Sequence, residues 1–167
     1  MMDRLKRVGC AALAAAAATT VLAASPAGAV AIGEEGCTPG YWKNHTENWL
    51  ENAARAIAPS TLITSVYAGA ATRANLAGVT LLQGLQGGGG SGVNGAAVIL
   101  ARAASAAYLN AAHEGLGYPW RRNAAGLGGR PALVPIVNAA FRSGDRATML
   151  ALASRLDADN NLGCPLS

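Results

Sequence analysis

The chain has few charges, few aromatic rings and almost no lysine. Charged residues make up 13% of its 167 residues and aromatic residues 5%, and the formal net charge is +4. This small, evenly spread surplus excludes the basic footprint that nucleic-acid binding requires. Lys6 and Lys43 are its two lysines, and this arginine bias beside abundant alanine and glycine indicates a GC-rich bacterial genome. That observation concerns codon usage and not function.

Motifs of enzyme active sites are missing too. The sequence has no G-x-S-x-G elbow, no HExxH pair and no Ser–His–Asp order that follows a known template. Residues Gly90 to Gly95 match G-x-G-x-x-G, but a dinucleotide site needs a preceding strand, a parallel sheet and an acid about 20 residues on. No such sheet is expected here, so this stretch is interpreted as a flexible connector. Carboxylate pairs for glycoside cleavage leave no mark in sequence spacing, and that class stays open.

Residues 1–29 have the three parts of a cleavable secretory signal peptide. A basic start is followed by an uncharged, alanine-rich stretch at 8–24, and the A-x-A sequence at 27–29 places small residues before Val30. A membrane anchor is disfavoured because the apolar run, of about 17 residues, is at the lower limit for crossing a bilayer. A lipoprotein is disfavoured because Cys10 lies at the start of that run and not at its end. We therefore expect cleavage before Val30, export, and no stable membrane insertion afterwards.

Export changes how the charges and cysteines are interpreted. Without residues 1–29, three basic residues and one acid are lost from totals of 13 and 9, and the net charge falls to +2. The remaining cysteines, Cys37 and Cys164, would be in an oxidising compartment, where an even pair predicts a disulfide. Such a bond closes a loop of roughly 130 residues and would stabilise the fold by about 4–5 kcal/mol. A metal site of two thiolates is disfavoured because no CxxC pair accompanies them.

The remaining sequence predicts a mobile lead at 30–36 and one disulfide-closed helical domain at 37–167. No segment alternates convincingly with period two, so we expect an all-α domain of about four to six helices with little or no sheet. Pro39 and Gly40 favour a turn over residues 37–40. Helices are expected from about Thr46 to Pro59, at 60–66, at 80–85, from 93 or 94 to 112, at 131–142 and at 145–156. The fourth has few charges and is expected at the centre of the fold.

An aromatic and polar group beside the first cysteine is the candidate ligand site. If the rings are exposed, they could stack on sugar rings or on a partner protein. If they are buried, the two tryptophans pack the first helix against the core, and this second interpretation is favoured because the interior is rich in alanine. The candidate ligand-binding residues are Tyr41, Trp42, Lys43, Asn44, His45 and Trp49.

Two further patterns are candidates for metal binding. His45 and His113 with a carboxylate from Glu47, Glu114 or Asp157 could hold one ion in a small hydrolase, although structural roles for the histidines are favoured. Oxygens at Asp157, Asp159 and Asn161 imitate the first half of an EF-hand calcium loop. The sixth position of that loop is Leu162 instead of glycine, and the chain ends before the bidentate glutamate. A polar helix end explains this segment without calcium, and no cofactor is expected.

The segment Gly36-Cys37-Thr38-Pro39-Gly40-Tyr41-Trp42-Lys43-Asn44-His45, with Trp49 after it, resembles the opening of a group of secreted bacterial proteins. These proteins carry a C-T-P-G-Y-W-K-N-H module alone or within larger extracellular chains. The resemblance extends through Leu109 to His113 and Asp157 to Cys164. It implies export and a common fold, and it transfers no catalytic residue.

Taken together, the sequence favours a secreted, non-catalytic module that binds cell-wall polysaccharide or an extracellular protein. A small metal-dependent hydrolase using His45 and His113 is the first alternative, and a calcium-stabilised scaffold is the second. The oligomeric state leaves no signal in the sequence.

Overall fold

A computed structural model describes residues 32–49, 57–113 and 115–166. This part of the chain contains six α-helices, short 3₁₀ turns and two isolated β-bridges, and it has no strand. The expected all-α class, the helix number and the Cys37–Cys164 disulfide are therefore confirmed. The helices are α1 (Pro39–Asn44), α2 (Ile63–Val66), α3 (Leu81–Gln86), α4 (Gly92–Asn110), α5 (Leu133–Ser143) and α6 (Arg146–Asn160).

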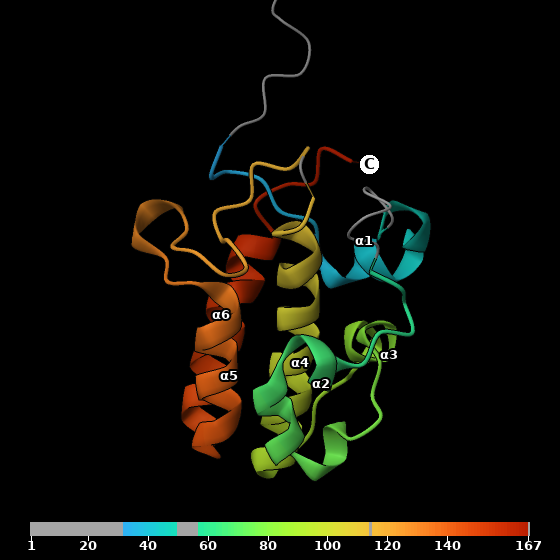
Figure 1. The fold of residues 1–167 in the computed structure, drawn as a ribbon, viewed down its shortest axis with the longest axis vertical. Helices are drawn as coiled ribbons and strands as arrows, with labels where there is room; N and C mark the ends of the chain where they lie inside the picture. Colours follow the sequence, from blue (N-terminus) through green and yellow to red (C-terminus); the bar gives the residue numbers. More distant parts are fainter. Residues whose placement is uncertain (1–31, 50–56, 114, 167) are drawn as a thin grey trace, which may run out of the picture.

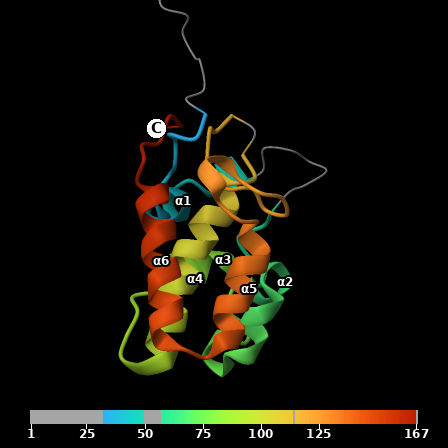
Figure 2. The same cartoon turned by 90° about the vertical axis from the view of Figure 1, so that its left-hand side faces the viewer.

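Helix α4 is the centre of the fold, as its sequence predicts. Figures 1 and 2 show it running between α6 and α5 on one side and α3 on the other. Seven of its alanines are buried, and such small side chains let the neighbouring backbones approach closely. By length and composition α4 could also cross a membrane, but 61% of the relevant window is buried inside the domain. It therefore has the burial of a core helix.

The other helix ends follow from local capping. The Thr80 hydroxyl accepts a hydrogen bond from the Gln83 backbone N–H, and Gln83 Oε1 accepts one from the Thr80 backbone N–H, which fixes the start of α3. Gly144 adopts a left-handed φ of 64° and ends α5, and Asp145 then caps α6 through Thr148. The predicted break between these two helices is confirmed.

The turn predicted over residues 37–40 is wrong, because α1 begins there. Thr38 is the N-cap, and its hydroxyl accepts a hydrogen bond from the Tyr41 backbone N–H at 3.0 Å. Pro39 occupies the first helical position, where its missing N–H has no helical partner to lose and its fixed φ suits the helix. Helix α6 also runs four residues further than expected, to Asn160. Both differences place more of the polar sequence inside helices.

Some predictions lie wholly or partly outside the described residues. The signal peptide at 1–29 and residues 50–56 of the helix expected from Thr46 belong to this group. The start of that helix is seen as a 3₁₀ turn, Thr46–Trp49.

The lead expected to be mobile is bonded to the domain where the structure describes it. Gly33 donates a backbone hydrogen bond to Gly117, and Gly36 donates one to Gly163. A Cβ atom at Gly36 would collide with the backbone carbonyl of Asp159. This close approach requires glycine at position 36 and joins the two ends of the domain beside the disulfide.

A candidate functional site beside a buried polar network

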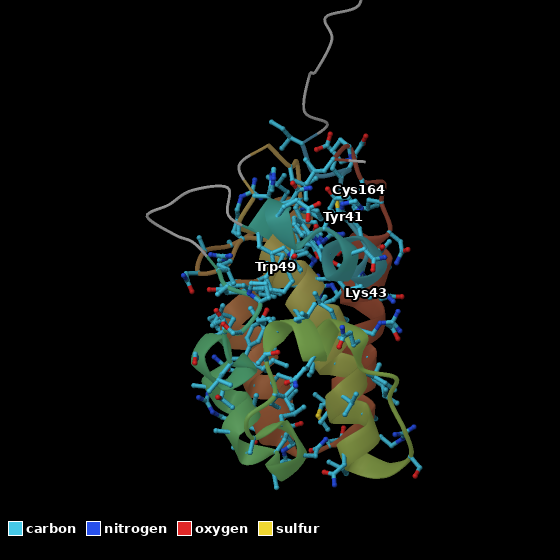
Figure 3. All side chains as sticks on the ribbon, turned by 90° about the vertical axis from the view of Figure 1, so that its right-hand side faces the viewer. Tyr41, Lys43, Trp49 and Cys164 are labelled. Carbon is cyan, nitrogen blue, oxygen red and sulfur yellow. A yellow bond between two sulfur atoms is a disulfide. The ribbon has the colours of Figure 1, made fainter. Side chains whose placement is uncertain are left out.

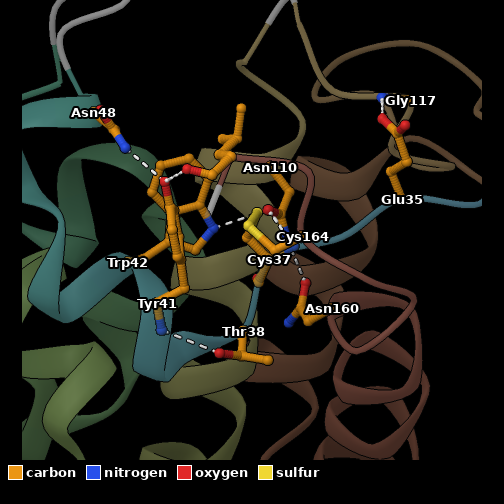
Figure 4. Close-up of a disulfide and its surroundings, with 11 residues drawn as sticks. Glu35, Cys37, Thr38, Tyr41, Trp42, Asn48, Asn110, Gly117, Asn160 and Cys164 are labelled. Atoms are coloured by element: carbon orange, nitrogen blue, oxygen red, sulfur yellow. Dashed lines mark hydrogen bonds between the residues drawn. A yellow bond between two sulfur atoms is a disulfide. The ribbon is translucent and has the colours of Figure 1, made fainter. Parts of the chain in front are cut away.

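The disulfide lies next to an asparagine whose side-chain oxygen and nitrogen each form two hydrogen bonds. Asn110, the last residue of α4, is 1% exposed. Its Oδ1 accepts hydrogen bonds from the Cys37 backbone N–H at 3.0 Å and from the Trp42 indole Nε1–H at 2.8 Å. Its Nδ2 donates to the Cys37 carbonyl and to Asn160 Oδ1, both at 2.9 Å (Figure 4). One side chain thus joins the first cysteine, α1 and the end of α6.

Asn160 extends the network to the loop after α4. This side chain is fully buried, and its Oδ1 also accepts a hydrogen bond from the Tyr118 hydroxyl at 2.7 Å. Its Nδ2 donates to the Ala103 carbonyl inside α4. Burial, together with the negative charge of Asp159, raises the pKa of Tyr118 well above its ordinary value, so the hydroxyl keeps the proton that it donates.

Asp159 holds the next part of the loop through an ion pair. Its Oδ1 lies 2.7 Å from Arg130 Nη2, and its Oδ2 accepts from Arg130 Nε and from the Trp120 indole. Burial by itself would raise the pKa of this carboxyl. The hydrogen bonds from Arg130 and Trp120 and the charges of Arg130 and Arg155 outweigh it, and the pKa lies below its ordinary value.

Replacing Asp159 with asparagine is expected to remove this ion pair. The free energy of unfolding should then depend less on pH in the acidic range. Because the folded pKa is below the ordinary value of 3.8, the stabilisation is present above that value and is lost as the pH falls through the folded pKa. Asp159→Asn should lower the free energy of unfolding at pH 7 by about 2–3 kcal/mol, since Arg130 and Trp120 lose their charged acceptor. Urea unfolding between pH 7 and pH 2 measures both effects.

The matched control is Asp157→Asn, an exposed acid on the same helix. It should stay within about 0.5 kcal/mol of the unchanged protein. Equal midpoints for the two variants at pH 7 would show that the Asp159 pair adds no stability.

The three residues considered for a calcium loop do not share a loop. Asp157 and Asp159 lie inside α6, and both carboxylate oxygens of Asp159 are used by Arg130 and Trp120. Asn161 caps the helix, and its side chain donates to the Asp157 carbonyl. The polar segment therefore ends a helix here, and its likeness to an EF-hand loop does not extend to its geometry.

The tryptophans beside Cys37 do not form an exposed binding surface. Trp42 is 1% exposed and Trp49 is 4% exposed, so the favoured interpretation of core packing is correct for both tryptophans. The Trp49 indole donates a hydrogen bond to the Trp42 carbonyl at 2.9 Å, and this bond fixes the Trp49 ring against the backbone of Trp42. Figure 3 shows Trp49 set into the body of the molecule and Lys43 on α1. The structure brings these residues together as a packing unit.

The other residues of the motif lie on the surface of α1 or at its end. Lys43 and Asn44 are exposed. Tyr41 donates its hydroxyl hydrogen bond to the Leu166 carbonyl and stacks on the ring of His45, with ring centroids 4.4 Å apart. His45 Nδ1 lies 3.0 Å from a carboxylate oxygen of Glu47.

A cleft opens on the other side of the buried tryptophans. Its volume is about 530 Å³, and the space lies between Trp49, the last turn of α4 and the loop that follows Trp120. Trp42, Trp49, Ile57 and small side chains at the end of α4 form its apolar part. Its polar lining residues are Asn48, Tyr108, His113, Arg121, Arg122 and Asn123. The cleft therefore combines indole surface with amides and two guanidinium groups.

The two arginines of the cleft are held by the protein. Arg122 lies 3.7 Å from the centre of the Tyr108 ring, and its Nε donates to the Tyr108 carbonyl at 3.1 Å. Arg121 donates from Nη1 to the carbonyls of Tyr118 and Trp120. Both guanidinium groups are half-buried. A fixed donor such as Arg121 costs little conformational entropy when it binds a ligand.

The cleft was not predicted from the sequence, apart from its tryptophans and His113, which was considered as a metal ligand. Asn48, Tyr108 and the 121–124 loop come from three separated segments, and no spacing rule connects them. The one available signal was the adjacent pair Arg121-Arg122 directly after Tyr118-Pro119-Trp120, because two neighbouring cations follow two rings there.

The histidine pair of the hydrolase alternative gains no support from the geometry. His45 lies beside Glu47, whereas His113 lines the cleft near Trp42. Among the residues that the structure describes, no three histidine, cysteine or acidic side chains form a group that could hold a metal ion. Glu114, one of the carboxylates considered, lies outside the described residues.

Comparisons with known proteins do not place this chain in a family. A scan against protein-family models finds no match, and searches of the curated proteins and of the solved structures find no significant match. The resemblance to secreted proteins with the C-T-P-G-Y-W-K-N-H module therefore stays a prediction. The candidate site rests on the geometry described above.

Proposed function

We propose that the chain is an exported, non-catalytic module that binds a cell-surface polysaccharide in the cleft beside Trp49. The observation that carries this proposal is the cleft itself. Its volume of about 530 Å³ is within the range of small-ligand sites, about 300–1,000 Å³. Export is supported by the signal-like residues 1–29 and by the disulfide, which is typical of oxidising compartments.

The chemistry of the cleft suits a sugar better than a purely apolar ligand. A sugar ring presents C–H surface on its faces and hydroxyl groups around its edge. The alkyl groups of Ala112 and Ala124 are the accessible apolar lining and fit the first, and the amides of Asn48 and Asn123 offer both donors and acceptors for the second. A few polar groups around an apolar surface are the usual arrangement of a ligand site.

The test is retention of the purified protein on immobilised cell-wall polysaccharide. The double variant Arg121→Ala/Asn123→Ala removes two polar groups of the cleft. Because Arg121 also donates to the carbonyls of Tyr118 and Trp120, its thermal midpoint is measured beside retention to show that the variant is folded. We expect about tenfold weaker retention or more, because each lost ligand hydrogen bond, if it involves a charged group, is worth about 1.5–3 kcal/mol. Trp42→Ala is unsuitable because that ring is part of the core.

The matched control is Asn94→Ala/Arg142→Ala, which changes the same residue types at exposed positions. Asn94 lies at the start of α4 and Arg142 near the end of α5, far from the cleft end of the domain (Figure 2). The control should be retained like the unchanged protein. Equal retention of both double variants would place binding elsewhere, and retention only in the presence of cell-wall protein would indicate a protein partner.

A further inference from the structure

We infer that the end of the domain opposite the disulfide binds the phosphate groups of an anionic membrane surface through Arg73, Arg142 and Arg146. The contact is peripheral, without insertion into the bilayer. It uses a part of the molecule that the polysaccharide cleft does not include, so it goes beyond the proposed function. It follows from the uneven distribution of charge along the domain.

The turn between α5 and α6 brings the three arginines together. Figures 1 and 2 show this turn at the end of the molecule farthest from the C-terminus. Arg142 and Arg146 lie on either side of it, and both are exposed. Arg73 reaches the same turn from another segment, since a Cβ atom placed on Gly144 would lie 3.5 Å from its Nη1 and 3.6 Å from its Nη2. All three cations therefore belong to one surface region.

The segment that carries Arg73 is fixed against α5. It follows the 3₁₀ helix Ala68–Thr72, which packs on α5. The Thr72 hydroxyl donates a hydrogen bond to the Phe141 carbonyl at 3.2 Å, and the Gly69 backbone N–H donates one to Asn138 Oδ1 at 2.7 Å. The position of Arg73 beside the turn is thus determined by the packing of the domain.

None of these three arginines has a carboxylate partner among the described residues. Arg73 donates from Nε to the Thr72 hydroxyl, and Arg146 donates from Nη1 to the Gly92 carbonyl. The other donors of both groups, and all donors of Arg142, form no hydrogen bond within the described part of the chain. Arg73 is half-buried, and the other two are exposed. Their guanidinium groups therefore keep donors for an anion outside the domain.

The acid nearest to these arginines is engaged elsewhere. Asp145 is the N-cap of α6, and its Oδ2 accepts hydrogen bonds from the Thr148 backbone N–H at 2.7 Å and from the Thr148 hydroxyl at 2.6 Å. These two bonds hold the pKa of Asp145 below its ordinary value, so the residue carries a negative charge. It lowers the positive charge of this end without pairing with an arginine.

Charges elsewhere in the described domain balance each other. Toward the disulfide end the bases are Lys43, Arg121, Arg122, Arg130 and Arg155, and the acids are Glu34, Glu35, Glu47, Asp157 and Asp159. Arg102, midway along α4, is the remaining described charge. The turn between α5 and α6 has three bases and one acid, so its surplus equals the net charge of +2 of the chain without residues 1–29. The fold thus gathers at one end a surplus that is scattered in the sequence.

An anionic lipid surface fits this end better than a single polymer chain. The arginines come from separate segments at the tip of the domain, where they can meet phosphate groups spread over a plane. Each arginine near such a surface strengthens binding about fivefold. The exposed large apolar side chains of the described residues, Ile32, Leu62, Leu127 and Leu162, lie outside the turn. The attraction is therefore electrostatic, and salt weakens it.

Cosedimentation of the exported protein with lipid vesicles tests this inference. Vesicles of phosphatidylglycerol mixed with phosphatidylcholine should bind the protein at least about tenfold more tightly than vesicles of phosphatidylcholine alone. Arg142→Gln/Arg146→Gln should weaken binding to the mixed vesicles by about twentyfold. Asp145→Asn should strengthen it about fivefold, because asparagine still caps the helix and the negative charge is gone.

The matched control is Arg102→Gln/Arg155→Gln, which removes the same charge from two other exposed positions. Arg155 lies nine residues after Arg146 in α6, about 13 Å along the helix and beyond the screening length of about 8 Å at physiological salt. The control should bind within about twofold of the unchanged protein.

Three results would overturn the inference. Equal binding to mixed and neutral vesicles would show that no anionic surface is recognised. Equal losses in the two double variants would show that only the net charge matters. Binding of a glycerol-phosphate oligomer without binding of vesicles would replace the membrane with a phosphate polymer. The gain expected for Asp145→Asn cannot arise from misfolding, and none of these results changes the retention on polysaccharide that tests the cleft.

Discussion

Replacing Asn110 with leucine is expected to lower the free energy of unfolding by about 3–5 kcal/mol, because it leaves several buried polar groups without partners at once. The Cys37 N–H and carbonyl and the Trp42 indole N–H all bond to this side chain. Leucine has the branched shape of asparagine and is larger, so the loss does not arise from a cavity and combines the missing hydrogen bonds with overpacking. A loss of this size is a large part of the stability of a small domain, about 5–15 kcal/mol.

Urea unfolding followed by tryptophan fluorescence measures this loss. The control is Asn94→Leu, the same change at an exposed position near the start of the same helix, which should alter stability by less than about 0.5 kcal/mol. If Asn110→Leu unfolds within about 1 kcal/mol of the unchanged protein, the network does not hold this end of the domain.

Removing the disulfide by Cys37→Ser/Cys164→Ser is expected to have an effect of similar size. The bond joins residues 127 positions apart, and in the chain-entropy model a loop of that length contributes about 4–5 kcal/mol by restricting the unfolded chain. Cys37 is also fully buried, so its replacement by serine leaves a hydroxyl in the core that needs a partner. The thermal midpoint of the double variant should fall by well over 10 °C for this reason.

Reducing agent supplies the control for the disulfide. Dithiothreitol should lower the midpoint of the unchanged protein toward that of the double variant and leave the double variant unaffected. If the double variant melts like the oxidised protein, closure of the chain is not a source of its stability.

The sequence predicted the parts of the fold that depend on local patterns. The long alanine-rich run gave α4 within two residues at each end, and Thr80, Gly144 and Asp145 marked helix boundaries that the structure confirms. The pairing of Cys37 with Cys164 followed from their being the only cysteines left after residue 29. Each of these features is determined by a few neighbouring residues or by a simple count.

The start of α1 was missed because the same residues are compatible with a turn and with the first positions of a helix. Proline followed by glycine favours a turn, but Thr-Pro is also the N-cap and first position of a helix. The structure selects the helix, since the Thr38 hydroxyl caps the Tyr41 N–H and Trp42 is then directed to Asn110. Tertiary packing decided between two local conformations that the sequence permits.

The polar network and the assembly of the cleft could not be predicted from the sequence. Asn110 and Asn160 are isolated amides near helix ends, and nothing in their neighbouring sequence shows that both are buried and bonded to each other. The cleft requires three distant segments to meet, around Trp49, Tyr108 and Arg121. Such sites depend on long-range packing, for which a single sequence carries no periodic signal.

The structure changes the role of the C-T-P-G-Y-W-K-N-H segment. Its cysteine, threonine and tryptophan close and pack the domain (Figure 4), and its proline occupies the first position of α1. The proposed ligand contacts come instead from the polar residues on the opposite side of the tryptophans. A sequence motif that attracts attention as a binding site is here mainly the support on which the cleft is built.

The most direct test of the central claim is to locate a bound soluble cell-wall oligosaccharide by heteronuclear NMR on the isotope-labelled protein. We predict that the largest shift changes occur at the side-chain amides of Asn48 and Asn123, the Arg121 Nε–H, and the backbone amides of residues 121–124. The amides of α5 near Arg142 should stay unchanged at saturating ligand. Changes confined to α5 and the start of α4, or no changes anywhere, would contradict the assignment of this cleft as the binding site.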